Sequence, residues 1–213
     1  MRKIQSGYTL VELSVALALA GTIVLASVAG TMSLIDQQRV NDFAVQNADA
    51  IKRINDVYAQ LSNYNGLSLR QAVSFGAFRQ FIINNAGTDN VTVTHPFGGA
   101  IGVAPINNGG FMAWGLYLNA VPAKYCSDLL FQAEPLSDAL VVFPDGMANP
   151  VGWAPSLGIN TALPAIIVTA GFGGSAPIFA KNLNTDLAPN TLGQACNAVG
   201  NNFGVLLVRS KLR

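Results

Sequence analysis

The residue with the most informative chemistry in this sequence is a single carboxylate near the N-terminus. Glu12 is the only charged residue between Thr9 and Ile35, a stretch rich in leucine, valine and alanine. A carboxylate at the centre of a bilayer costs roughly 2.5–3.5 kcal/mol on insertion scales. That cost predicts a cationic partner for Glu12. The two groups would form an ion pair in a medium of low dielectric constant.

The residues outside this segment do not form the pattern of a catalytic or metal-binding site, so the sequence predicts no enzyme. His95 is the only histidine, and its place before Pro96 and two glycines predicts a turn or surface residue. No cluster of histidine, cysteine and carboxylate residues has the spacing of metal ligands. The glycine-rich segment 171–174 lacks the lysine and the strand–helix context of a phosphate loop, so we expect a mobile loop there. We therefore expect no catalytic residues, no cofactor and no metal.

The charged residues of the C-terminal half predict solvated surface. Twelve basic and eleven acidic residues give a formal net charge of +1, which makes nucleic acid an improbable partner. A solvated acidic face is expected at Asp128, Glu134 and Asp138. A solvated basic tail is expected at Arg209, Lys211 and Arg213. The alternative for this tail is a contact with DNA or with an acidic patch on a neighbouring subunit.

The segment that carries Glu12 is long enough to cross a membrane as a helix. Residues 13–35 are uncharged, whereas about 20 apolar residues suffice to span a bilayer. Arg2 and Lys3 should hold the N-terminal end in the cytoplasm by the positive-inside rule. A secretory signal peptide is the alternative, but the apolar run is too long and no clear small-residue cleavage site interrupts it. The position of Gly7 between the basic residues and the apolar run indicates cleavage before the apolar segment.

The helix is expected to continue beyond the apolar segment as an amphipathic half. Apolar residues recur at helical spacing, namely Val40, Phe43, Ala44, Ile51, Ile54, Tyr58 and Leu61. Asn63, Asn65 and Gly66 then end the pattern. We predict one helix from about Tyr8 to Leu61. Its hydrophobic half, residues 8–35, would protrude, and its amphipathic half, residues 36–62, would pack on the rest of the chain.

Residues 63–213 predict a loop-rich head domain. All ten prolines lie at or after Pro96, and only three of the 21 glycines precede Gly66. Helices are predicted over Leu69–Asn84, from Pro122 onward, and over Leu187–Val199. Strands are predicted over Val91–Thr94, Ala100–Val103, Phe111–Leu118, Leu140–Phe143, Ala165–Thr169 and Phe203–Val208. The fold class is therefore α+β, with a long N-terminal helix packed on an antiparallel sheet.

Cys126 and Cys196 are the only two cysteines of the chain. An even number of cysteines behind a membrane-targeting segment predicts a disulfide formed in an oxidising compartment. Residues 126–196 would then form a large disulfide-bounded region. Two reduced and unrelated buried thiols are the alternative.

The N-terminal sequence resembles the processing motif of type IV pilins and related pseudopilins. The motif is the run Gly7-Tyr8-Thr9-Leu10-Val11-Glu12 behind a basic leader. The resemblance implies that residues 1–7 are a leader peptide, which prepilin peptidase removes by cutting between Gly7 and Tyr8. It also implies that the new amine of Tyr8 is methylated and that Glu12 is the family's assembly glutamate. The cationic partner of Glu12 would be the Tyr8 amine of a neighbouring subunit or, alternatively, of the same one.

The head resembles the type IVb branch of these pilins. The shared features are the Phe97-Gly98-Gly99 turn, a helix that bears Cys126, and Cys196 just ahead of a terminal strand. The short leader and the aromatic Tyr8 are closer to the other branch. The resemblance implies a major pilin, a structural subunit that polymerises into a filament for adhesion, aggregation, motility, conjugation or DNA uptake. Its implied partners are further copies of itself, prepilin peptidase, the pilus assembly machinery and the membrane.

This resemblance also implies a location and leaves rival functions. The prepilin would lie in the inner membrane with a periplasmic head, and the assembled filament would be extracellular. A minor pilin or a secretion pseudopilin is the nearest rival, although priming minor pilins often lack the glutamate. A signal-anchored binding module that never polymerises is a rival from another class, and it predicts no N-methyl-Tyr8. Gly21 and Gly30 are weak helix positions that would permit either local melting or close approach of helices.

Overall fold

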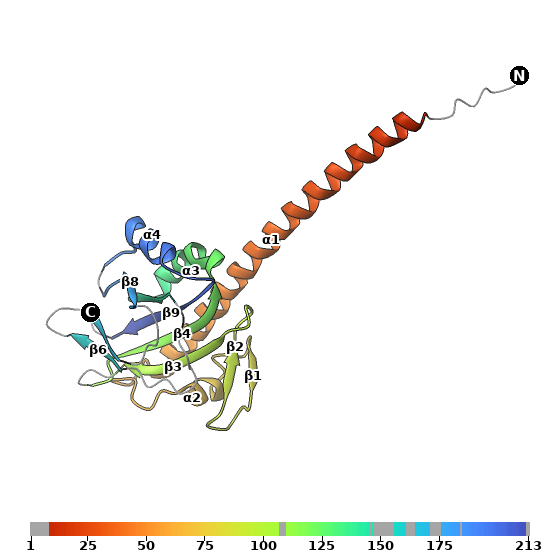
Figure 1. The fold of residues 1–213 in the computed structure, drawn as a ribbon. Helices are drawn as coiled ribbons and strands as arrows, with labels where there is room; N and C mark the ends of the chain where they lie inside the picture. Colours follow the sequence, from red (N-terminus) through yellow and green to blue (C-terminus); the bar gives the residue numbers. More distant parts are fainter. Residues whose placement is uncertain are drawn as a thin grey trace, which may run out of the picture. The chain divides into compact units, whose positions relative to one another are not determined.

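The structure is a computed structural model that describes residues 9–106, 110–144, 146, 156–160, 165–170, 176–183 and 185–211. The chain divides into two units, Met1–Arg39 and Val40–Arg213. The long helix α1, Leu10–Tyr58, contributes residues to both units (Figure 1).

The first unit is an apolar stretch of α1 whose hydroxyl groups bond to its own backbone. Its large apolar side chains are exposed, from Leu10 at 85% to Ile35 at 48%. Ser14 and Thr22 donate to carbonyl oxygens three residues earlier, and Ser27 and Thr31 donate to carbonyl oxygens four residues earlier. Such internal bonds satisfy polar groups where no water is available. Among the described residues, α1 alone is long and apolar enough to cross a membrane, judged by length and composition.

The second unit is built around a seven-stranded antiparallel sheet with the order β1-β2-β3-β4-β9-β5-β8 (Figure 1). The strands are β1 (Ile82–Asn84), β2 (Thr92–Thr94), β3 (Ala100–Ile106), β4 (Ala113–Pro122), β5 (Ala139–Phe143), β8 (Ile178–Lys181) and β9 (Asn202–Ser210). A separate hairpin pairs β6 (Ser156–Asn160) with β7 (Ala165–Ala170). β9 lies between β4 and β5, so the strand nearest the C-terminus is interior to the sheet.

The amphipathic half of α1 packs into the core of this unit as its spacing predicts. Its residues Val40, Phe43, Ile51, Ile54 and Tyr58 are at most 5% exposed, and they share one apolar cluster with strand residues of the sheet. Burial of each large apolar side chain contributes about 1.5–3 kcal/mol. The prediction fails at the end of the pattern, because α1 ends at Tyr58 and Leu61 is 53% exposed.

Four short helical segments connect the strands. They are α2 (Leu69–Ser74), the 3₁₀ turn η1 (Ala123–Tyr125), α3 (Cys126–Ala133) with its 3₁₀ extension η2 (Glu134–Leu136), and α4 (Pro189–Asn197). Helices α3 and α4 lie side by side (Figure 1). Pro122 precedes this helical stretch as expected, although it is also the last residue of β4.

The predicted helix over Leu69–Asn84 is wrong in its second half. The helix ends at Ser74, because Gly76 adopts a left-handed φ of +78°, a conformation that terminates helices. Residues 82–84 form strand β1 instead, and Ile82 is 65% exposed. The other predicted strands and helices are present with shifted ends, whereas β6 and β8 were not predicted. The predicted loop 171–174 lies outside the described residues.

Candidate functional site

The first turn of α1 holds Glu12 in a reciprocal hydrogen-bonded arrangement with Thr9. The backbone N–H of Glu12 donates to Thr9 Oγ1 at 3.3 Å. In return, Glu12 Oε2 accepts from the Thr9 backbone N–H at 3.5 Å and from the Thr9 hydroxyl at 3.4 Å. This is the geometry of a capping box, in which the N-cap threonine and the glutamate three residues later each satisfy a free N–H group. This role of Thr9 was not predicted, although the Thr-x-x-Glu spacing indicates it.

The capping box leaves Glu12 available for a further partner. Both of its contacts use Oε2, and no described residue bonds to Oε1. The side chain is exposed, and a carboxylate in the first turn interacts favourably with the helix dipole. Gly7 and Tyr8 lie outside the described residues, so the cleavage position and the ion pair stay predictions.

The predicted disulfide is present between Cys126 and Cys196. The two sulfur atoms are 1.99 Å apart and the Cα atoms 5.6 Å apart. Cys126 is the first residue of α3 and Cys196 lies in the last turn of α4, so the bond fastens these two helices together. It closes a sequence separation of 70 residues that includes β5 and β8.

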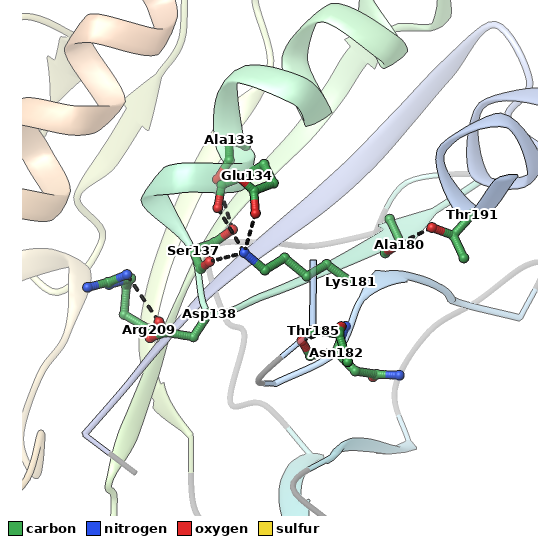
Figure 2. Close-up of polar contacts among 10 residues, drawn as sticks. All are labelled: Ala133, Glu134, Ser137, Asp138, Ala180, Lys181, Asn182, Thr185, Thr191 and Arg209. Carbon is green, nitrogen blue, oxygen red and sulfur yellow. Dashed lines mark hydrogen bonds and ion pairs between the residues drawn. The ribbon is translucent and has the colours of Figure 1, made fainter. Parts of the chain in front are cut away.

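A nearly buried lysine binds the end of the α3 helical segment to β8 (Figure 2). Lys181 Nζ donates to Glu134 Oε1 at 2.8 Å, to the Ser137 carbonyl oxygen at 3.0 Å and to the Glu134 carbonyl oxygen at 3.1 Å. Its side chain is only 10% exposed. Free carbonyls at a helix end bind a cation favourably, and three acceptors compensate for the desolvation of the ammonium group. The role of Lys181 was not predicted, although Lys181 is the only basic residue between Lys124 and Arg209.

The expected solvated acidic face is wrong for two of its three residues. Glu134 binds Lys181, and Asp138 accepts from Arg209 Nη1 at 3.2 Å (Figure 2). Asp138 also accepts from the Ser210 backbone N–H at 2.7 Å. Asp128 is exposed as expected. Glu134 and Asp138 therefore bind β8 and β9 rather than facing solvent alone.

The expected solvated basic tail is also wrong where the structure describes it. Arg209 is paired with Asp138. Lys211 Nζ donates to the carbonyl oxygens of Tyr58 and Leu61 at the end of α1 and lies 4.9 Å from the centroid of the Tyr64 ring. Arg213 lies outside the described residues.

His95 lies in the expected turn, but it is buried rather than at the surface. It is 1% exposed, and burial lowers the pKa of His95 to about 4, an effect partly opposed by its hydrogen bond to the Asn119 carbonyl. No carboxylate or nucleophile forms a catalytic pair with it among the described residues. Within the same residues, no group of three or more histidine, cysteine, aspartate or glutamate side chains is placed to hold a metal ion.

The chain is similar to one family model and to two relatives that are named as pilus subunits. Residues 2–28 match the family described as the prokaryotic N-terminal methylation motif. The chain is 30% identical over 117 residues to the major structural subunit of bundle-forming pilus from Escherichia coli O127:H6 and from Escherichia coli O111:H-. The match covers 55% of this chain and spans 58% of the length of each relative. Both relatives are structural subunits rather than enzymes.

Solved structures provide a match to the fold. TcpA, a type IV pilin from Vibrio cholerae El Tor biotype, matches with a TM-score of 0.50 and 19% identity over 81% of this chain and 99% of that one. A type IVb pilin from Salmonella typhi gives a TM-score of 0.47 and 12% identity over 78% and 97% of the two chains. The TcpA match shows a shared fold, and it agrees with the predicted class of a long helix on an antiparallel sheet.

Proposed function

We propose that this chain is a type IV pilin and the structural subunit of a pilus, a proposal supported by its fold and by its N-terminal methylation motif. Copies of the chain polymerise through the apolar half of α1 and present the disulfide-bounded unit to the exterior. The role of the relatives in bundle-forming pilus supports this assignment and favours a major over a minor pilin. It also favours filament aggregation over adhesion, motility, conjugation or DNA uptake as the first role to test.

One observation carries the proposal, the coincidence of the methylation motif with an exposed apolar helix that contains one capped carboxylate. The motif covers residues 2–28, and Glu12 lies in the first turn of the exposed helix. A helix that exposes large apolar side chains along its length requires either lipid or other helices around it. A pilin subunit meets both, first in the membrane and then in the filament core.

The proposed assembly chemistry joins the amine of Tyr8 to Glu12. Cleavage after Gly7 by prepilin peptidase creates a cationic amine at Tyr8, which the same enzyme methylates. Each charge is costly alone in an apolar environment, so pairing stabilises the aligned arrangement and disfavours a shifted one. Because Glu12 Oε2 is occupied by Thr9 of its own chain, we propose that Oε1 receives the amine of a neighbouring subunit.

The proposed cellular path follows from the same segments. Residues 1–7 are the leader and residues 8–35 cross the inner membrane, with the basic leader in the cytoplasm and the head, residues 63–213, in the periplasm. There the oxidising environment permits the disulfide. The inner-membrane assembly machinery then adds the subunit to an extracellular filament.

Mass spectrometry of the mature N-terminus tests the processing step. The expected result is a chain that begins with N-methyl-Tyr8. An uncleaved chain, or a chain cut after the apolar segment, would contradict the proposal and favour a signal-anchored binding module.

Electron microscopy of sheared surface material, probed with antibody to residues 66–213, tests the filament. Labelling along the shaft is expected for a major pilin. Labelling confined to the tips would indicate a minor pilin. Absence of labelled filaments would contradict the proposal that the chain is a structural subunit of a pilus.

A further inference from the structure

The turn between β2 and β3 places a histidine in the core of the second unit. The backbone N–H of His95 donates to the Gly99 carbonyl at 2.9 Å, and the backbone N–H of Gly98 donates to the His95 carbonyl at 2.8 Å. Gly98 has a φ of +87°, which glycine adopts without strain. A Cβ atom on Gly99 would lie 1.8 Å from the Asn119 carbonyl oxygen and 2.4 Å from His95 Nε2. The turn therefore fits closely against β4 at Asn119.

Both ring nitrogens of His95 are engaged, and their partners fix the neutral tautomer. The Phe97 backbone N–H donates to His95 Nδ1 at 3.2 Å, so Nδ1 carries no proton. Nε2 then carries the proton and donates to the Asn119 carbonyl oxygen at 2.6 Å. Asn119 precedes Ala120, which has a φ of +53° within the irregular register of β4 between Leu118 and Val121. The imidazole thus joins its own turn to the irregularity in β4.

The surroundings of the imidazole are aromatic and uncharged. The ring centroids of Phe43, on α1, and Phe97 lie 5.2 Å and 5.8 Å from that of His95. Phe97 stacks on Tyr125 at 4.7 Å, immediately before Cys126. Of the nearby charged residues on the packed elements, Asp42 on α1 is exposed, and Lys124 on η1 lies 4.6 Å from the Tyr125 ring centroid. Among the residues that the structure describes, no charged side chain is therefore placed to stabilise an imidazolium at His95.

We propose that His95 is an acid-sensitive latch, which holds the β2–β3 turn to β4 and to Tyr125 while neutral and releases this contact when protonated. Protonation places a hydrogen on Nδ1, where it faces the Phe97 N–H, so an accepted hydrogen bond becomes a contact between two donors. It also leaves a cation without a counter-charge among aromatic rings. Release of Phe97 removes the ring on which Tyr125 stacks, beside the helix that bears the disulfide.

The direction of the pH response follows from the burial of His95. Burial lowers the pKa of His95 from 6.5 to about 4 in the folded chain. The unfolded imidazole therefore takes up a proton first, and the contribution of the latch is complete above about pH 6.5 and is lost as the pH falls toward 4. Between pH 7.5 and 4.5 the unfolding equilibrium constant should rise on the order of 10²-fold through this residue alone.

The test is a comparison of the full chain in detergent micelles with two variants that do not titrate. His95→Asn keeps an acceptor for the Phe97 N–H, and His95→Gln keeps a donor toward Asn119. Unfolding equilibria are measured at pH 7.5 and 4.5, and the difference between wild type and variants isolates His95 from the carboxylates that titrate in all three. Between pH 7.5 and 4.5, the unfolding equilibrium constant of the wild type should rise about 10²-fold more than that of either variant. Equal pH responses in all three chains would overturn the proposal.

Measurements on the wild-type chain test the latch without depending on the folding of the variants. NMR of the ¹⁵N-labelled imidazole should show Nδ1 unprotonated at pH 7 and a titration midpoint near 4. Hydrogen exchange of the Phe97 amide, corrected for its intrinsic rate, should accelerate over the same pH range. A midpoint near 6.5, or exchange that does not respond to pH, would refute the latch.

Discussion

Lys211 donates a 2.6 Å hydrogen bond from Nζ to the backbone carbonyl oxygen of Tyr58, the last residue of α1. The same ammonium binds the Leu61 carbonyl, and the backbone N–H of Lys211 donates to the Met112 carbonyl at 2.8 Å. A residue just beyond β9 therefore supplies the cation that the free carbonyls at the end of α1 favour. The long helix and the sheet are joined at this point by a side chain as well as by apolar packing.

Replacing Lys211 should therefore destabilise the second unit. Lys211→Ala should lower the free energy of unfolding by about 1–2 kcal/mol, because carbonyl groups of Tyr58 and Leu61 lose a charged donor. Denaturant titration of the full chain measures the effect. Lys52→Ala is the matched control, since its pair with Asp56 is exposed and should contribute no more than about 0.5 kcal/mol. Equal effects of the two substitutions would contradict the capping role.

Substitution of Lys181 should destabilise the chain more than substitution of Lys211, because the Lys181 side chain is nearly buried. Lys181→Met keeps much of the apolar stem but leaves three acceptors at Glu134 and Ser137 without their donor. We expect a loss of about 2–4 kcal/mol. Glu134→Gln retains both the carbonyl and a side-chain oxygen, so it should cost only about 1 kcal/mol. If the two variants melt at the same temperature, the buried ammonium is not the stabilising group.

Substitution by alanine should have opposite effects on the stability of the chain at Gly99 and at Gly193. Gly99→Ala forces a Cβ against the Asn119 carbonyl and should cost about 3 kcal/mol or prevent folding. Gly193→Ala lies within α4 with open space around it and should stabilise the chain by about 0.5–1 kcal/mol. Thermal unfolding of the two variants provides the comparison. A Gly99→Ala chain as stable as wild type would show that the turn is not held against β4.

Glu12→Ala tests the proposed charge pairing at the N-terminus. Membrane insertion and cleavage should remain largely intact, because the substitution makes the segment more apolar. Filament yield should fall, since the Tyr8 amine of a neighbouring subunit loses its counter-charge. Sheared filaments are measured by immunoblot against total subunit, and yield equal to wild type would refute the pairing.

Thr9 offers a matched pair of variants for the same site. Thr9→Ser retains the hydroxyl that bonds to Glu12, and it should assemble like wild type. Thr9→Val keeps the shape but removes the capping box, so we expect fewer filaments at equal subunit abundance. Indistinguishable yields from the two variants would show that Thr9 does not position Glu12.

Elements with a long periodic pattern could be predicted from the sequence, and short ones only in part. The helix α1 and its buried face follow from a 3.6-residue repeat that runs from Val40 to Tyr58. Over residues 69–84 the apolar residues fit a helix and a helix–turn–strand equally well, and Gly76 decides between them through its backbone conformation. Strand β8 has only four residues, too few to show any periodicity.

The charged contacts of the second unit carried little local signal. Arg209 is 71 residues from its partner Asp138, and Lys211 is 153 residues from Tyr58. A basic cluster near the end of a sequence is usually solvated, and nothing near Arg209 or Lys211 in the chain distinguishes this case. The disulfide was predicted because two cysteines permit a single intramolecular bond. The capping box was not predicted, although Thr-x-x-Glu is a local spacing that indicates it.

The interior place of β9 sets an order of events for folding. Strands β4 and β5 each bond to β9, so both wait for a strand that is synthesised after all of residues 144–201. In the proposed topology the N-terminus stays in the cytoplasm and the part of the head that follows α1 crosses the membrane first, so strands with open edges are present until β9 arrives. Unpaired edges readily join other chains. We therefore expect the proposed exported subunit to be most vulnerable to proteases and chaperones before β9 pairs with β4 and β5.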